Sequence, residues 1–82
     1  MDRTDVHDKL RAFVITDLIR MPGYDLQDDE PLITGGLIDS FSLAQFGVFV
    51  EETFGLYIPD PDLTVENLDT LHQMVDRVMQ GA

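Results

Sequence analysis

Apolar residues recur at three- and four-residue steps in three separate segments of the sequence, and this spacing restricts the fold more than any other feature. Such steps place side chains along one face of an α-helix. The repeating positions are Val6, Leu10, Phe13, Val14, Leu18 and Met21; then Leu43, Phe46, Gly47, Val50 and Phe54; and last Leu71, Met74, Val75 and Val78. The pattern predicts three amphipathic helices that bury these faces against one another.

The length of the chain and its lack of cysteine indicate how such helices are held together. The 82 residues suit one small domain, which we assign to residues 1–82. Without cysteine there is no disulfide, so the core depends on apolar burial, and 44% hydrophobic residues suffice for a few packed helices. Leu63, Val65 and Leu68 indicate a short extra helical turn near residues 64–67. The predicted fold is an all-α bundle of three longer helices and one short helix, with a long loop between the first two longer helices.

Polar residues, glycine and proline mark the expected helix ends. Thr4 or Asp5 can cap the first helix, and Pro22-Gly23 ends it, because proline cannot continue a helix. Gly55 ends the second helix, and Asp69 is predicted to cap the last.

The stretch from Gly35 to Leu43 contains the strongest candidate for a functional residue. Asp39 is a suitable cap for the second helix, which places Ser40 at its first helical position with the hydroxyl outside the packed face. A helix N-terminus carries free N–H groups and partial positive charge, so a phosphate ester is tolerated there. The apolar loop residues that precede Ser40 are expected to pack on the bundle and hold it in place; they are Leu32, Ile33, Leu37 and Ile38.

The face of the second helix opposite its apolar stripe is predicted to bind partner proteins. Its members are Phe41, Ala44, Gln45, Val48, Glu51 and Glu52. Phe41 and Val48 are large apolar residues on this outer face, which is typical of an interaction surface. We expect Phe49, on the flank, to be covered by another helix. Ile58 in the following loop is expected to plug the bundle and to contribute to the partner surface.

Charge restricts the partners. The net charge is −11, and the five basic residues are Arg3, Lys9, Arg11, Arg20 and Arg77. This field repels nucleic acid and attracts basic protein surfaces. No apolar run is long enough to span a membrane, and no basic-then-apolar signal opens the sequence. We therefore expect a cytoplasmic protein that binds neither nucleic acid nor membrane.

Catalytic and metal-binding patterns are missing from the sequence. A nucleophilic serine needs a nearby base, yet His7 and His72 lie near opposite ends, and there is no Gly-x-Ser-x-Gly elbow. Both histidines are interpreted as surface residues. The acid pair of Asp60-Pro61-Asp62 lacks the glycine and spacing of a calcium loop, and Asp28-Asp29-Glu30 is interpreted as solvated. We therefore expect that the chain has no metal site and no enzymatic activity of its own.

The run from Leu37 to Phe41 resembles the phosphopantetheine attachment motif of acyl carrier proteins, in which Asp-Ser precedes a large apolar residue. The run from Glu51 to Asp60 resembles the end of the family's second helix and the loop after it, and the similarity extends from Val6 to Val78. The resemblance implies that Ser40 carries 4'-phosphopantetheine, whose thiol holds acyl groups as thioesters. It also implies a monomer that a phosphopantetheinyl transferase modifies, with Asp39 recognised by the transferase, and that acyl-loading and acyl-processing enzymes then bind.

Several residues of the second helix differ from those typical of the family, and the differences indicate the biosynthetic pathway in which the carrier would act. Fatty-acid carriers typically have acids on the exposed face soon after the serine, where this chain has Ser42 and Gln45, and Phe41 replaces a common leucine. These differences favour a free-standing carrier of specialised metabolism, such as polyketide or nonribosomal peptide synthesis. An aminoacyl or peptidyl carrier, or an acidic interaction module without a prosthetic group, remain alternatives.

Gly47 lies on the buried face of the second helix. It either allows close packing of a neighbouring segment, the more common case, or leaves room in the core for cargo.

Overall fold

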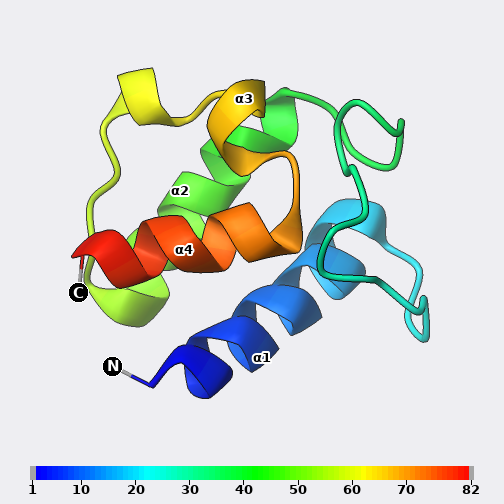
Figure 1. Cartoon of the computed structure of the whole chain (residues 1–82), viewed down its shortest axis with the longest axis horizontal. Helices are drawn as coiled ribbons and strands as arrows, with labels where there is room; N and C mark the ends of the chain where they lie inside the picture. Colours follow the sequence, from blue (N-terminus) through cyan, green and yellow to red (C-terminus); the bar gives the residue numbers. More distant parts are fainter. Residues whose placement is uncertain (1, 82) are drawn as a thin grey trace.

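The computed structural model describes residues 2–81, and within this range it contains helices and loops but no strand. The elements are α1 (Arg3–Phe13), the π-helical turn η1 (Val14–Ile19), α2 (Phe41–Phe54), the 3₁₀ turn η2 (Asp60–Asp62), α3 (Val65–Leu68) and α4 (Leu71–Gly81). In Figure 1 the long connection between η1 and α2 runs along one side of the bundle. The predicted all-α bundle with three longer helices is confirmed.

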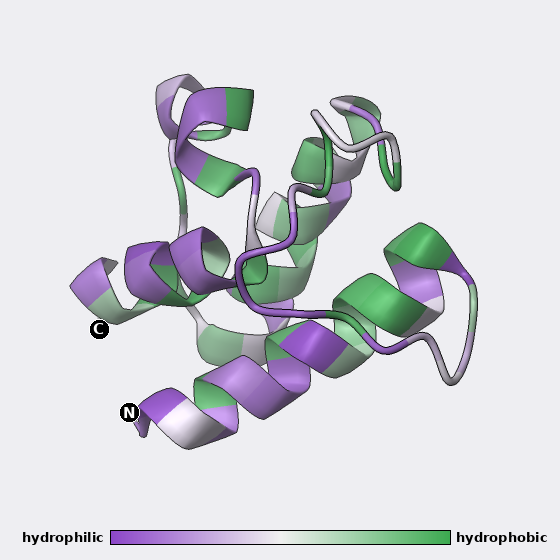
Figure 2. Cartoon of the chain, turned by 45° about the vertical axis from the view of Figure 1, so that its right-hand side comes forward, coloured by the Kyte–Doolittle hydropathy of each residue, from purple (hydrophilic) through white to green (hydrophobic). Residues whose placement is uncertain are grey.

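The core lies among α1, α2 and α4, and α4 packs against both α1 and α3. Hydrophobic and hydrophilic residues alternate along α1 and α4 in Figure 2, as expected for helices with one buried face. The largest side chains that are fully buried are Phe46, Leu10, Leu32, Leu68, Leu71 and Met74. No helix in the described range is long and apolar enough to cross a lipid bilayer.

The first helix differs from the prediction at both ends. Asp2 caps it, in place of Thr4 or Asp5, by accepting a hydrogen bond from the Thr4 N–H at 3.3 Å. Helical structure ends at Ile19, because Arg20 adopts a left-handed conformation with φ 61°. Proline disfavours helical geometry in the residue before it, so the helix ends upstream of Pro22 itself. Met21, predicted on the buried face, is consequently half-exposed.

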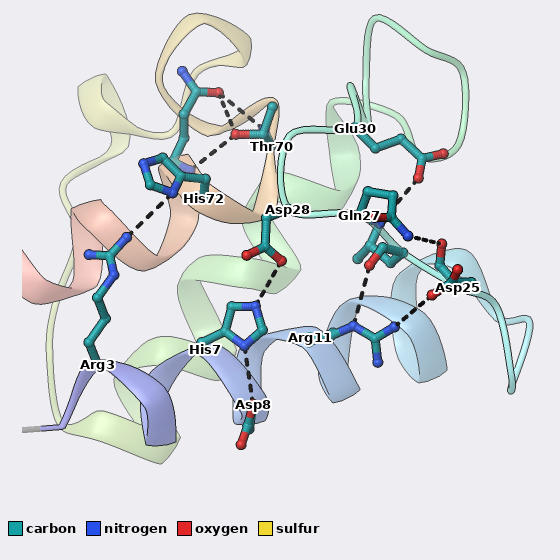
Figure 3. A network of polar contacts seen from close by, with 12 residues as sticks. Arg3, His7, Asp8, Arg11, Asp25, Gln27, Asp28, Glu30, Thr70 and His72 are labelled. Atoms are coloured by element: carbon teal, nitrogen blue, oxygen red, sulfur yellow. Dashed lines mark hydrogen bonds and ion pairs between the residues drawn. The ribbon is translucent and has the colours of Figure 1, made fainter.

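His7 is not the fully solvated histidine expected from the sequence. Its ring lies between Asp8 and Asp28, and its Nε2 atom is 2.8 Å from the Asp28 carboxylate in the long connection (Figure 3). The hydrogen bonds to Asp28 and Asp8 raise the pKa of His7. The contact between His7 and Asp28 fastens the long connection to α1.

The last helix is capped by Thr70, and the prediction that Asp69 caps it is wrong. The Gln73 N–H donates to Thr70 Oγ1 at 3.1 Å, and the Thr70 N–H donates back to Gln73 Oε1 at 3.1 Å. This reciprocal pair is a capping box, whose Thr-x-x-Gln spacing is visible in the sequence. The Asp69 carboxylate is therefore free to bind another part of the chain.

Substitutions on the buried and on the exposed side of α2 are expected to affect stability differently. Leu43 is 3% exposed, so Leu43→Ala is expected to reduce the free energy of unfolding by about 2–5 kcal/mol. Phe41 is 73% exposed, and Phe41→Ala is expected to leave that free energy nearly unchanged. Urea denaturation of both variants measures the difference, and equal losses would contradict the observed orientation of α2.

Candidate functional site

Ser40 lies at the junction between the long connection and α2, and its side chain is exposed. Its backbone is already helical, with φ −66° and ψ −22°, although the assigned helix begins at Phe41. Asp39 precedes it, and Asp39 Oδ1 accepts a hydrogen bond from the Ser42 N–H at 3.2 Å. Asp39 thus occupies the capping position expected from the sequence, and the Ser40 side chain makes no capping hydrogen bond.

Two glycines allow the tight path of the chain just before this site. Gly36 has φ 83°, in the left-handed region that side chains rarely adopt. At Gly35 a Cβ atom would lie 2.2 Å from the Pro31 carbonyl oxygen, closer than atoms can approach. Both positions therefore require glycine for the connection to turn back toward α2.

Leu32 is the point at which this turn joins the core. Its side chain is fully buried, and its carbonyl accepts hydrogen bonds from the N–H groups of Leu37 (2.9 Å) and Ile38 (3.0 Å). Its own N–H donates to the Asp69 carbonyl at 2.7 Å. Ile38 is buried, and Ile33 and Leu37 are partly buried. The expected packing of this apolar set is therefore observed.

The Asp69 carboxylate fastens the connection to the start of α4. Oδ1 accepts hydrogen bonds from the N–H groups of Ile33 (2.8 Å) and Thr34 (3.0 Å), and Oδ2 accepts one from Thr34 Oγ1 (2.6 Å). Partial burial raises the pKa of this carboxyl, but the hydrogen bonds from Thr34 and the loop backbone lower it by more. The net pKa of Asp69 lies below its ordinary value.

A hollow of about 610 Å³ lies between the end of η1 and the start of α2, and its lining includes the neighbours of Ser40 in the sequence but not Ser40 itself. Gly36, Asp39 and Phe41 from the Ser40 side contribute to its wall, and Arg20 contributes a guanidinium group from the other side. An exposed hydroxyl at a helix start is compatible with a phosphate ester. The described residues contain no group of three or more His, Cys, Asp or Glu side chains that could hold a metal ion.

The outer face of α2 contains most of the residues predicted to bind partners. Phe41 and Val48 are 73% and 56% exposed, and the exposed residues Ala44, Glu51 and Glu52 lie on the same helix. Gln45 is half-buried. Phe49 is covered as expected, because its ring stacks on Phe13 with centroids 4.1 Å apart.

Two residues are placed differently from their predicted roles. Ile58 is 3% exposed, which agrees with a plug but leaves little of its side chain for partner contact. Ser42 was placed on the exposed face, but it is 7% exposed and its hydroxyl lies 3.4 Å from Asp39 Oδ1. The helix start therefore presents one serine to solvent and buries the other.

The chain is similar to a protein of known type. The chain is 33% identical over 67 residues to an acyl carrier protein of Acidothermus cellulolyticus. The matched region makes up 82% of this chain and 77% of that protein. No family model matches the chain.

Asp69 provides a test of how the connection is held. Its lowered pKa means that the ionised carboxylate stabilises the fold above its ordinary pKa, and that this stability is lost as pH falls through the lower folded-state pKa. Asp69→Asn is expected to reduce the free energy of unfolding at neutral pH by about 1–3 kcal/mol. Urea denaturation across a pH series measures this loss, which should shrink in acid.

Asp29→Asn is the matched control, because Asp29 is an exposed carboxylate of the same connection. Its stability is expected to follow that of the unchanged chain. A pH-independent loss in Asp69→Asn would show that the charge of Asp69 contributes nothing.

Proposed function

The chain belongs to the acyl carrier protein family, and from this premise we propose that Ser40 is the residue to which 4'-phosphopantetheine is attached. The proposal rests chiefly on one observation, the exposed Ser40 side chain at the start of α2. The attached group supplies a thiol that holds an acyl cargo as a thioester. The chain itself acts as the carrier and as the substrate of other enzymes.

The environment of Ser40 fits such a modification. Capping is done by Asp39, so the Ser40 hydroxyl is not required for helix stability. Asp39 and Phe41, on either side of Ser40 in the sequence, line a hollow that also includes Arg20, whose charge is opposite to that of a phosphate. The fastening of Leu32 and Thr34 to Asp69 keeps the backbone before Ser40 in one position.

The proposed modification is a group transfer from coenzyme A. Ser40 Oγ forms a bond to the phosphorus atom of coenzyme A that carries the pantetheine portion. The bond between that phosphorus and the oxygen that bridges it to the second phosphate breaks. Adenosine bisphosphate leaves, and the hydroxyl proton passes to a base of the phosphopantetheinyl transferase. Ser40 contributes the reacting oxygen, and Asp39 keeps the helix start in the geometry that the transferase meets.

The outer face of α2 is proposed as the surface for the transferase and for acyl-loading and acyl-processing enzymes. Phe41 and Val48 offer exposed apolar area, and Glu51 and Glu52 offer negative charge. With a net charge of −11, the chain attracts basic docking surfaces at a distance. Charge steering speeds encounter more than it tightens binding, which suits a carrier that must dissociate after each transfer.

Loading of Ser40 is directly measurable. Incubation with coenzyme A, magnesium and a transferase of broad specificity is expected to raise the intact mass by one phosphopantetheine unit. Ser40→Ala is expected to abolish the increase, because it removes the reacting oxygen.

Ser42→Ala is the matched control, since Ser42 is buried two residues further along the chain, and this variant is expected to be loaded. An unchanged mass of the parent chain, or loading that survives in Ser40→Ala, would contradict the proposal. An unmodified chain would leave an acidic interaction module as the remaining interpretation.

For the pathway, we propose a free-standing carrier of specialised metabolism, with an aminoacyl or peptidyl cargo as the alternative. The support is the composition of the first two turns of α2, where the outer positions hold Phe41, Ala44 and Gln45, and acids first appear at Glu51. Enzymes that recognise acidic residues in the first two turns of this helix therefore meet fewer negative charges here.

A malonyl transferase of fatty-acid synthesis is therefore expected to load the phosphopantetheinylated chain slowly. The double substitution Phe41→Leu with Gln45→Glu is expected to raise kcat/KM, because it restores an acid and a smaller apolar residue. Steady-state kinetics with both proteins measure the effect. Efficient loading of the unsubstituted chain would favour a role in fatty-acid synthesis instead.

A further inference from the structure

The first half of the long connection is an acidic segment that lies against α1. We define the acidic segment as residues 24–30, and its carboxylates belong to Asp25, Asp28, Asp29 and Glu30. The rest of the chain is also acidic, since the net charge is −11. Like charges repel one another, so cations on the facing helix help to hold this segment in place.

Two side chains of α1 supply such cations. Arg11 Nη2 lies 3.7 Å from Asp25 Oδ1, and His7 Nε2 lies 2.8 Å from Asp28 Oδ1 (Figure 3). Arginine keeps its charge throughout the physiological pH range, whereas histidine gains or loses its charge near neutrality. Of these two contacts, the one at His7 can therefore respond to pH in the neutral range.

The contacts of the His7 ring suit an imidazolium that carries a proton on both nitrogens. Nδ1 lies 3.1 Å from Asp8 Oδ1, while Nε2 faces Asp28. An ionised carboxylate only accepts hydrogen bonds, so both acids are satisfied only when both ring nitrogens donate. A neutral ring has one N–H, so the contact with one acid is lost and the contact with the other loses its charge.

The other groups around His7 do not replace this charge. A hollow of about 280 Å³ beside His7 is lined by Arg3, Thr4, Asp28, His72 and Val75. Arg3 on α1 lies 2.7 Å from Asp76 on α4, so its charge is already paired. His72 on α4 also faces Asp76, with its Nε2 atom 3.2 Å from Oδ2.

Asp28 connects the acidic segment to α4 as well as to α1. Its carbonyl accepts the His72 N–H at 3.0 Å, in the first turn of α4, where N–H groups lack partners within the helix. The later part of the connection is held separately, because Asp69 accepts hydrogen bonds from Ile33 and Thr34. The connection thus has two independent fastenings.

We propose that His7 is a pH-sensitive switch for the acidic segment. Protonated His7 holds Asp28, and with it the segment, against α1 and α4. Neutral His7 lets the segment open locally, while the residues bound to Asp69 stay in place. The connection therefore opens in two stages, of which the first responds to pH near neutrality.

The direction of the effect follows from the two acids at the ring. Their hydrogen bonds raise the pKa of His7 above its ordinary value of 6.5. The contact therefore contributes its full stability below pH 6.5, and this stability is lost as pH rises through the higher folded-state pKa. The pKa of Asp69 is lowered, so that carboxylate stays ionised over the same range.

The expected size of the effect is modest, because water reaches the contact. The side chains of His7 and Asp28 are 28% and 56% exposed. Loss of the charge on His7 is expected to favour the open segment by about two- to fivefold, the range for exposed ion pairs.

Amide exchange, measured by nuclear magnetic resonance on the chain without any attached group, tests the inference. Rates are measured at about pH 5 and about pH 8, on either side of the histidine titration, and divided by those of an unfolded chain at the same pH. Protection of the His72 N–H, which reports on Asp28, is expected to fall about two- to fivefold at the higher pH. The Leu32 N–H, which donates to the Asp69 carbonyl at 2.7 Å, is expected to keep its protection.

His7→Gln supplies the variant, because glutamine can donate to Asp28 but has no charge at either pH. Protection of the His72 N–H is expected to be low and independent of pH in it. His72→Gln is the matched control. It removes the other imidazole and retains the backbone N–H at position 72, so its pH response is expected to match that of the parent chain.

Three results would overturn the inference. They are equal protection of the His72 N–H at both pH values in the parent chain, a pH response that survives in His7→Gln, and a response that disappears in His72→Gln. A parallel fall at Leu32 would show that the connection opens as one unit and would overturn the two-stage opening. None of these results depends on whether Ser40 carries a group.

Discussion

The fastening of the long connection to Asp69 is the constraint on which the geometry of Ser40 depends. The serine sits at a helix start, so its position follows from the path of the chain before it. That path contains two glycines and could take many conformations, but one carboxylate accepts three hydrogen bonds from Ile33 and Thr34. The side chain of Leu32, next to them in the sequence, is buried. The residues before Ser40 are therefore held both by hydrogen bonds and by apolar packing. An exposed hydroxyl can thus be held in place although nothing covers it.

The sequence predicted those parts of the fold that depend on local spacing. Leu43, Phe46 and Val50 follow one another at helical steps, and they are buried as predicted. Asp39 precedes such a run and lies in capping position. Both features depend on residues within a few positions of one another, so a single sequence contains all the information that they require.

Features that depend on distant pairs were not predictable in this way. Asp69 and Thr34 lie 35 residues apart, and His7 and Asp28 lie 21 residues apart, so no local pattern links either pair. An acid before a helix is also a common cap, which is why Asp69 was assigned that role. The Thr70-x-x-Gln73 capping box was the available signal that Asp69 served another purpose. Likewise, helical spacing could not show that Ser42 is turned inward onto Asp39.

The two flanks of α2 differ in how closely the neighbouring segments pack against the helix. On the α3 side Gly47 lets Leu63 approach closely, because a Cβ at Gly47 would lie 3.2 Å from Leu63 Cδ1, and the hollow that remains there is about 230 Å³. On the α1 side the rings of Phe13 and Phe49 connect the helices by stacking with their centroids 4.1 Å apart. The residues Gly47 and Phe49, two positions apart, therefore shape the two flanks of α2 differently, with a hollow of about 380 Å³ on the α1 side and one of about 230 Å³ on the α3 side.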